Sequence, residues 1–309
     1  MNVLILFHFL LICSSLISPK KKINKRKNII NISFAINNNY SKLLLIPLIS
    51  LLKNSNKNSI YYIHIMVGQE FEHRNYQLLC NLEKIYLNCF IHIINLGNDF
   101  DYVYKSFLDK SAYYRLELPD LCPNINRIIY VDTDTIILKD LMELYSLNFK
   151  GNYILAKLDI YPKELDNFNI YVKNYINSGV LLMDLYSLRK YGYVEKFINY
   201  TKVHNNKLYL NAHDQTVINY ICHEKIGILK PIYHMWAFND PKGFIEEHSK
   251  TRTSYNPIDV VKGYYDPFIV HFPGNMKYTE SNKNENHYYR MYDKYLNESK
   301  EIINKLNQY

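Results

Sequence analysis

The sequence predicts an α/β fold, built as one domain around a largely parallel sheet. Three observations lead to this expectation. Short apolar runs alternate with longer stretches of helical spacing, which is the pattern of βαβ units. The 309 residues, 48% hydrophobic and 21% charged, suit one domain with a developed core. No stretch rich in Gly, Ser or Pro divides the body of the chain.

The expected elements follow one another along the chain. Strands are expected at 29–36, 60–67, 89–96, 127–132, 178–185 and 268–272, where apolar and β-branched residues cluster. Helices are expected at 40–52, 70–85, 188–201, 213–222 and 284–306, the last of them polar. Because the carboxyl ends of parallel strands lie at one edge of a sheet, ligands are expected at that edge.

The charge of the chain is concentrated at its N-terminal end. The formal charge is +8, but residues 1–69 hold nine Lys or Arg and no acid, so the rest of the chain carries −1. The body therefore has no basic surface for a phosphate backbone, and we expect no nucleic-acid partner.

Residues 3–17 are mostly apolar, and a basic run follows at 20–27. Their length is close to that of a signal-peptide core. We expect residues 1–28 to form a signal peptide or short membrane anchor with a basic tether, and the chain to enter the secretory pathway. The five cysteines contain no CxxC pair, which favours buried small residues, with one or two disulfides if the chain is secreted.

The sharpest local signal is RIIYVDTDTIIL, in which an apolar strand ends at Asp132 and Asp134. Two carboxylates at that place can share Mg²⁺ or Mn²⁺, which prefer hard oxygen ligands. A second D-x-D, Asp99 and Asp101, lies in a Gly- and Asn-rich segment that is typical of a turn.

Two enzyme families use a strand followed by D-x-D. The D-x-D-x-T pattern resembles the first motif of haloacid-dehalogenase-type phosphatases, although that motif normally begins its domain and here it lies about 100 residues into the body. The other resemblance extends over 29–279, to glycosyltransferase family 8, the retaining enzymes that include glycogenin and lipopolysaccharide galactosyl- and glucosyltransferases. Six blocks carry it in order: ISFAINNNY, SAYYRLELPDLCPNINRIIYVDTDTIIL, ILAKLDI, INSGVLLMDL, HDQTVIN and IVHFPGNMKY.

This resemblance implies a single GT-A (Rossmann-like) domain over 29–283, with a mixed, mostly parallel sheet flanked by helices and a polar helix at 284–309. It implies a Mn²⁺ or Mg²⁺ site formed by Asp132, Asp134 and His271. Residues implied to bind the donor sugar are Asp159, Asn177, Ser178, Asp214 and Gln215, of which Asp159, Asp214 and Gln215 are implied to be catalytic. Residues implied to bind the nucleotide and its phosphates are Ala35, Asn37, Asn39, Tyr40, Arg115, Thr133, Gly274 and Lys277.

Some positions depart from the family pattern. Asn37 and Asn38 stand where the family often has Asp, HDQT replaces D-Q-D, and KYT replaces K-P-W. The expected function is transfer of a hexose, glucose or galactose, from a UDP-sugar to a glycan, lipid or protein acceptor, with retention of configuration. A GT-A-like protein that binds sugar nucleotides without turnover is the alternative, ahead of the phosphatase.

Overall fold

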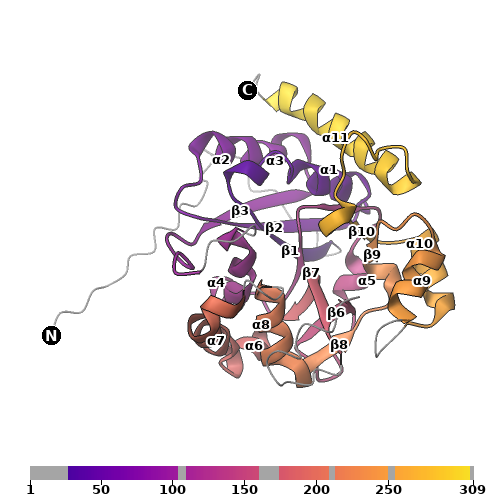
Figure 1. Ribbon diagram of the computed structural model, residues 1–309. Helices are drawn as coiled ribbons and strands as arrows, with labels where there is room; N and C mark the ends of the chain where they lie inside the picture. The colour runs from indigo at the N-terminus through magenta and orange to yellow at the C-terminus, as the bar shows by residue number, and fades with distance from the viewer. Residues whose placement is uncertain (1–26, 104–108, 160–173, 209–212, 250–254, 307–309) are drawn as a thin grey trace.

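The computed structural model describes residues 27–103, 109–159, 174–208, 213–249 and 255–306, and its centre is a seven-stranded sheet with helices on both faces (Figure 1). The strand order is β3-β2-β1-β4-β7-β6-β8, and every pair is parallel except the two that β7 makes with β4 and β6. These strands are β1 (Asn28–Ala35), β2 (Ser59–Val67), β3 (Cys89–Asn95), β4 (Arg127–Val131), β6 (Ile154–Leu158), β7 (Ile176–Asp184) and β8 (Ile226–Ile228). The predicted mixed, mostly parallel sheet is confirmed.

A second sheet of three short strands has the order β5-β10-β9. Its strands are β5 (Thr135–Ile137), β9 (Met235–Trp236) and β10 (Ile269–His271). The helices around the two sheets are α1 (Leu45–Lys53), α2 (His73–Cys80), α3 (Leu82–Ile85), α4 (Leu118–Leu121), α5 (Met142–Tyr145), α6 (Leu185–Lys190), α7 (Tyr193–Leu208), α8 (His213–Cys222), α9 (Pro241–Ser249), α10 (Pro257–Tyr265) and α11 (His287–Leu306). Short 3-10 helices lie at Asn38–Tyr40, Lys110–Glu117, His223–Lys225, Pro231–Tyr233 and Gly274–Met276.

The central strands are buried on both faces. In β4, Ile129 and Val131 pack into one hydrophobic core, whereas Ile128 and Tyr130 pack into another on the opposite face. Since neighbouring side chains of a strand point to opposite faces, a strand covered on both faces is a continuous apolar run in the sequence. This is why β1, β2 and β4 are visible in the sequence within one residue of their true ends.

The direction of each strand decides which loops meet. β1, β4 and β6 run the same way, so Ala35, Asp132 and Asp159 follow them at one edge of the sheet. β7 runs the opposite way, and its first residues, Ile176 to Ser178, therefore lie at the same edge. The second sheet adds His271, which pairs with Thr135 across β10 and β5. Segments far apart in the chain thus converge where β4 ends.

Several predicted helices differ from those observed. The helix expected at 70–85 is two helices, α2 and α3, separated at Asn81, and the one expected at 188–201 belongs to α6 and α7, separated where Gly192 has φ +66°. The helix expected at 40–52 begins only at Leu45, because a 3-10 turn precedes it. The strands β5, β6, β8 and β9 were not predicted as strands, although the segment of β6 belongs to the ILAKLDI block.

The terminal helix is amphipathic rather than polar, since it buries tyrosines and aliphatic residues against the body (Figure 1). It packs on α1, where Asn54 donates to the Tyr295 hydroxyl at 2.8 Å and Lys53 pairs with Glu298 at 2.9 Å. Among the described residues, no helix is long and apolar enough to span a bilayer, and the apolar segment at 3–17 lies outside them. Cys80, Cys89, Cys122 and Cys222 form no disulfide with one another, and Cys13 lies outside the described residues.

Candidate active site

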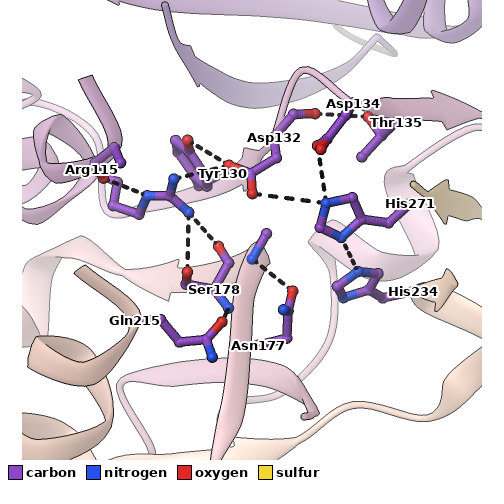
Figure 2. Close-up of polar contacts among 12 residues, drawn as sticks. Arg115, Tyr130, Asp132, Asp134, Thr135, Asn177, Ser178, Gln215, His234 and His271 are labelled. Atoms are coloured by element: carbon purple, nitrogen blue, oxygen red, sulfur yellow. Dashed lines mark hydrogen bonds and ion pairs between the residues drawn. The ribbon is translucent and has the colours of Figure 1, made fainter. Parts of the chain in front are cut away.

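Asp132 and Asp134 lie in the tight connection between β4 and β5, and His271 faces them from β10 (Figure 2). Nε2 of His271 is 3.0 Å from Oδ1 of Asp134 and 3.9 Å from Oδ2 of Asp132. One ligand atom from each of the three residues lies within 4.8 Å of the other two. Carboxylate oxygens with an imidazole nitrogen suit Mn²⁺ or Mg²⁺, so this donor set fits the ion that the sequence implies.

The connection that holds these two acids is fixed by backbone hydrogen bonds. The Asp132 N–H donates to the Gly179 carbonyl at 2.8 Å, and the Phe272 N–H donates to the Asp134 carbonyl at 2.9 Å. The Thr135 hydroxyl donates to the Asp132 carbonyl at 2.9 Å. Asp132 is therefore held to β7, and Asp134 is held to the residue that follows β10 and its His271.

The backbone of β7 at Gly179 packs directly against the cluster of Asp132, Asp134 and His271. A Cβ at this position would overlap Cε1 of His271 and would lie 2.8 Å from its Nδ1 and 2.9 Å from Oδ2 of Asp132. The backbone of β7 can approach the cluster only because residue 179 has no side chain.

The positive charges near Asp134 favour its ionised form. Burial alone would raise the pKa of Asp134, but the neighbouring His271 and the more distant Lys277 outweigh it and lower that pKa. Asp134 is therefore ionised near neutral pH, as a metal ligand must be.

Arg115 is the cation that joins the cluster to the rest of the site. Its guanidinium is 2.9 Å from Asp132 and 3.2 Å from Asp214, and it donates to the Ser178 carbonyl at 2.7 Å. The guanidinium also lies 4.1 Å from the centre of the Tyr130 ring, whose hydroxyl donates to Asp132. Burial would lower the pKa of Arg115, but Asp132 and Asp214 raise it, so the side chain is a permanent positive charge at 4% exposure.

The residues implied to bind the donor sugar form one buried hydrogen-bond network. Gln215 accepts from the Ser178 N–H at 3.0 Å and donates to Asp159 at 2.9 Å, which fixes the direction of its amide. Asn177 also donates to Asp159, at 3.1 Å, and the Ser178 hydroxyl donates to Asp214 at 3.1 Å. The structure thus brings together all five of these residues, from β6, β7 and α8.

Asp214 is a buried carboxylate, 3% exposed. Burial raises its pKa to about 6, because the opposing effect of Arg115 is smaller and Asp132 adds repulsion. The residue before it, His213, has φ +50°, a left-handed conformation that non-glycine residues rarely adopt. The backbone is thus bent sharply at the point where Asp214 and Gln215 enter the site.

The loop after β1 contains the residues implied to hold the nucleotide base. Asn37 Oδ1 accepts from the backbone N–H groups of Asn39 and Tyr40, at 2.9 and 3.3 Å. Asn38 accepts from Glu72 N–H and donates to the Glu70 carbonyl, so it ties the loop to the segment after β2. Asn37 uses its amide only as an acceptor here, which is a role that the Asp common in the family could also fill.

The residues implied to hold phosphate come from the turn after β10, the connection after β4 and the end of β1. Gly274 has φ +53° in the turn after β10, and Lys277, three residues on, is exposed and close enough to Asp134 to lower its pKa. Thr133 lies between the two acids and Ala35 at the end of β1, both partly buried. By contrast, the second D-x-D lies in a surface turn, where Asp101 pairs with Lys110 at 2.6 Å.

Three residues around the site were missed by the sequence reasoning. Tyr130 could have been inferred, since it lies two residues before Asp132 and so on the same face of the strand. Lys157 and His234, both fully buried, carry no signal in their spacing. Burial lowers the pKa of each below its usual range.

Comparison with known proteins now places the chain in a family. Residues 31–278 match the sequence model of glycosyl transferase family 8. The chain belongs to glycosyl transferase family 8. This membership confirms the resemblance inferred from the six blocks and decides against the phosphatase.

Relatives with sequence similarity include general stress protein A of Bacillus subtilis, 32% identical over 61% of this chain and 65% of its own length. A putative glycosyltransferase of Haemophilus influenzae is 27% identical over 64% of this chain and 61% of its length, so the chain spans less than two thirds of these first two relatives. The lipopolysaccharide 1,2-glucosyltransferase of Escherichia coli is 25% identical over 83% of this chain and 74% of its length. Among solved structures, the galactosyltransferase LgtC, crystallised with donor and acceptor sugar analogs, superimposes with a TM-score of 0.73 at 16% identity, covering 87% of this chain and 96% of that one. The fold of this family 8 chain is therefore the GT-A fold.

Proposed function

We propose that this family 8 chain is a retaining, metal-dependent glycosyltransferase that moves a hexose, glucose or galactose, from a UDP-sugar to an acceptor. The observation that carries the proposal is the convergence of Asp132, Asp134 and His271 with the polar network of Arg115, Asp159 and Gln215 at one edge of the sheet. Family membership and the GT-A fold support it, because both are shared with named sugar transferases.

Asp132, Asp134 and His271 would hold Mn²⁺ or Mg²⁺, which when bound supplies positive charge against the diphosphate of the donor. Lys277 and the turn at Gly274 lie where they can neutralise and approach the same phosphates. Arg115 pairs with Asp132 and stays charged, so together with the cation and Lys277 it would add a further positive charge near the leaving group.

The hydrogen-bond network of the residues implied to bind the donor sugar supplies negative charge. Cleavage of the bond between sugar and phosphate leaves positive charge on the sugar ring. Asp159 and Asp214 offer negative charge, and Gln215 offers an amide whose direction is fixed by Ser178 and Asp159. Asn177 and Ser178 would hold sugar hydroxyls, and groups held in place before the reaction are worth more than groups that must reorient.

The nucleotide would lie over the loop after β1. Ala35 ends that strand, Asn37, Asn39 and Tyr40 follow it, and Thr133 lies between the two acids after β4, the neighbouring strand. The acceptor is a glycan, a lipid or a protein. We further propose that the protein works in the secretory pathway, lumenal or tethered through residues 3–17, on the composition of that segment.

A donor panel tests the proposal. The full chain is incubated with Mn²⁺ and with each of several sugar nucleotides, and the released nucleoside diphosphate is measured. Release of UDP from UDP-glucose or UDP-galactose, lost on chelation with EDTA, is the expected result. Tight UDP binding without release from any donor on any acceptor would instead identify a sugar-nucleotide-binding protein. Phosphate release from a monoester would contradict both.

A further inference from the structure

His234 lies against His271 on the side that faces away from the two aspartates (Figure 2). Nε2 of His234 is 3.0 Å from Nδ1 of His271, and the two residues are 0% and 2% exposed. His234 comes directly before β9, and β9 pairs with β10 so that Trp236 lies opposite His271. The pairing of these two short strands thus places one imidazole behind the other.

The geometry restricts where the protons of the pair can be. Nε2 of His271 faces Asp132 and Asp134, so it must present a lone pair if it binds a cation there. The ring proton of neutral His271 must then lie on Nδ1, where the atom within reach is Nε2 of His234. His234 has to accept that proton in a hydrogen bond, and its own proton must then lie on Nδ1, which is buried and has no hydrogen-bond partner among the described residues. This unpaired N–H is a cost that binding of the cation at Nε2 of His271 has to offset.

Without an acceptor at residue 234, the opposite tautomer of His271 would be favoured. A buried N–H without a partner is costly, so the proton would move to Nε2, where Asp134 at 3.0 Å accepts it. That arrangement places a hydrogen atom at the position of the cation. Whether Nδ1 of His271 has an acceptor therefore determines whether its Nε2 has a lone pair available for the cation.

Two neighbours pack beside the pair. The backbone of Gly179 lies against the edge of the His271 ring, since a Cβ at residue 179 would overlap Cε1 and lie 2.8 Å from Nδ1. Trp236, which lies opposite His271 in the pairing of β9 with β10, has the Lys157 ammonium nitrogen 3.3 Å from the centre of its ring. Nδ1 of His234, Nζ of Lys157 and Nε1 of Trp236 are buried and have no hydrogen-bond partner among the described residues.

We propose that His234 is a positioning residue for metal binding, which accepts the Nδ1 proton of His271 and so keeps the Nε2 lone pair directed at Asp132 and Asp134. This inference rests on the metal site proposed above. An imidazole in this role adds no negative charge to a site that already has two carboxylates, unlike the carboxylate partners that often orient ligating histidines.

The test is a Mn²⁺ titration of the purified full chain without nucleotide, followed by the electron paramagnetic resonance signal of free Mn²⁺. His234→Phe fills the space but removes the acceptor, and we expect it to weaken Mn²⁺ binding about 10–100-fold, the usual effect of losing such a partner. In His234→Gln the Oε1 atom reaches about the position of the imidazole Nε2, and affinity should return to within about threefold of the parent. His234→Asn carries its acceptor on a shorter side chain and should bind as weakly as His234→Phe.

The control is His64→Phe, which removes a similar buried histidine whose Nδ1 lies 3.4 Å from that of His92, on strands outside the site. It should leave the Mn²⁺ affinity unchanged, and thermal unfolding without metal will show which variants fold. If His234→Phe does not fold, the Gln and Asn pair still decides. Equal affinity of parent, Gln and Asn variants would overturn the positioning role, as would a Gln variant as weak as Asn. A parent that binds no Mn²⁺ would overturn the metal site itself, and with it this inference.

Discussion

Asp214 is the residue whose ionisation ties activity most directly to pH. Its pKa is raised to about 6 by burial, so the carboxylate is charged above that pH and neutral below it. A neutral acid cannot stabilise positive charge on the sugar. We therefore expect the rate to fall as pH decreases through about 6, approaching tenfold per pH unit below it. The measurement is kcat/KM for UDP release between pH 5 and pH 8.

The raised pKa of Asp214 also makes the stability of the fold depend on pH, in the direction opposite to activity. Because the folded state raises this pKa, the ionised form of Asp214 is disfavoured on folding, and its contribution to the free energy of unfolding decreases as pH rises from about 4 to about 6. Asp214→Asn should then lose activity without lowering the unfolding temperature at pH 7. An Asn variant with normal kcat/KM and an unchanged acid limb would remove Asp214 from the catalytic set.

Gly179 offers a test of how closely β7 approaches the ligand cluster. Gly179→Ala would push against His271 and Asp132, because the added Cβ lies 2.8 Å from Nδ1 and 2.9 Å from Oδ2. We expect Mn²⁺-dependent UDP release to fall about 10²-fold, the size of effect that follows small displacements in an active site. Gly243→Ala is the matched control, since its nearest neighbour atom is 3.7 Å away. Equal activity of the two alanine variants would show that the cluster is not the reaction site.

At the scale of elements, the Asn38 side chain fixes the loop after β1 to the segment after β2. Asn38 accepts from Glu72 N–H and from the Asn75 amide and donates to the Glu70 carbonyl, at 2.9, 2.9 and 2.7 Å. Asn38→Ala removes all three bonds. At roughly 1 kcal/mol net for each lost bond, the donor KM should rise about tenfold or more, while kcat changes little because no reacting group moves. Initial rates over a range of UDP-sugar concentrations separate the two constants, and a lowered kcat at unchanged KM would contradict this role.

How much of this arrangement was visible in the sequence depends on the length and burial of each element. β1, β2 and β4 are covered on both faces and form apolar runs, and β4 delivers Asp132 visibly to its end. β6 is as short as β4 and as buried, but Lys157 interrupts its apolar run, and it was not predicted. β9 has two residues and β8 three, too few to show a periodicity, and their formation depends on tertiary pairing.

Long-range pairings were also beyond local patterns. The sequence places Arg115 and Asp214 ninety-nine positions apart, and only the packing of α8 against the 3-10 helix at Lys110–Glu117 brings them within 3.2 Å. The family resemblance supplied their shared location, whereas the ion pair itself and the His234–His271 contact required the structure.

For the whole molecule, glycosylation sequons test which surfaces of the fold are accessible and whether the protein enters the secretory pathway. Four N-x-S/T sequons occur, at Asn31, Asn39, Asn199 and Asn297. Asn31 lies within β1 with its amide bonded to Tyr145, and Asn39 lies in the proposed nucleotide loop. Asn199 on α7 and Asn297 on α11 are exposed. In a secretory host we expect glycans at Asn199 and Asn297 alone.

Mass spectrometry of glycopeptides from active protein measures this occupancy. Active protein with a full glycan on Asn39 would mean that the donor does not lie over this loop. Occupancy at Asn31 would show that β1 is not paired as described, because its side chain also lies 3.3 Å from His64 in the neighbouring strand.

The claim on which the account depends is that Asp132 and Asp134 hold the cation that makes glycosyl transfer possible. It is tested most directly by measuring Mn²⁺-dependent UDP release from UDP-glucose and UDP-galactose for the parent and for Asp132→Asn and Asp134→Asn, each with its unfolding temperature. We predict that both variants fold like the parent and lose about 10²–10³ of its rate, the usual effect of removing one electrostatic stabiliser. A folded variant of either kind that keeps the parental Mn²⁺-dependent rate would contradict the account.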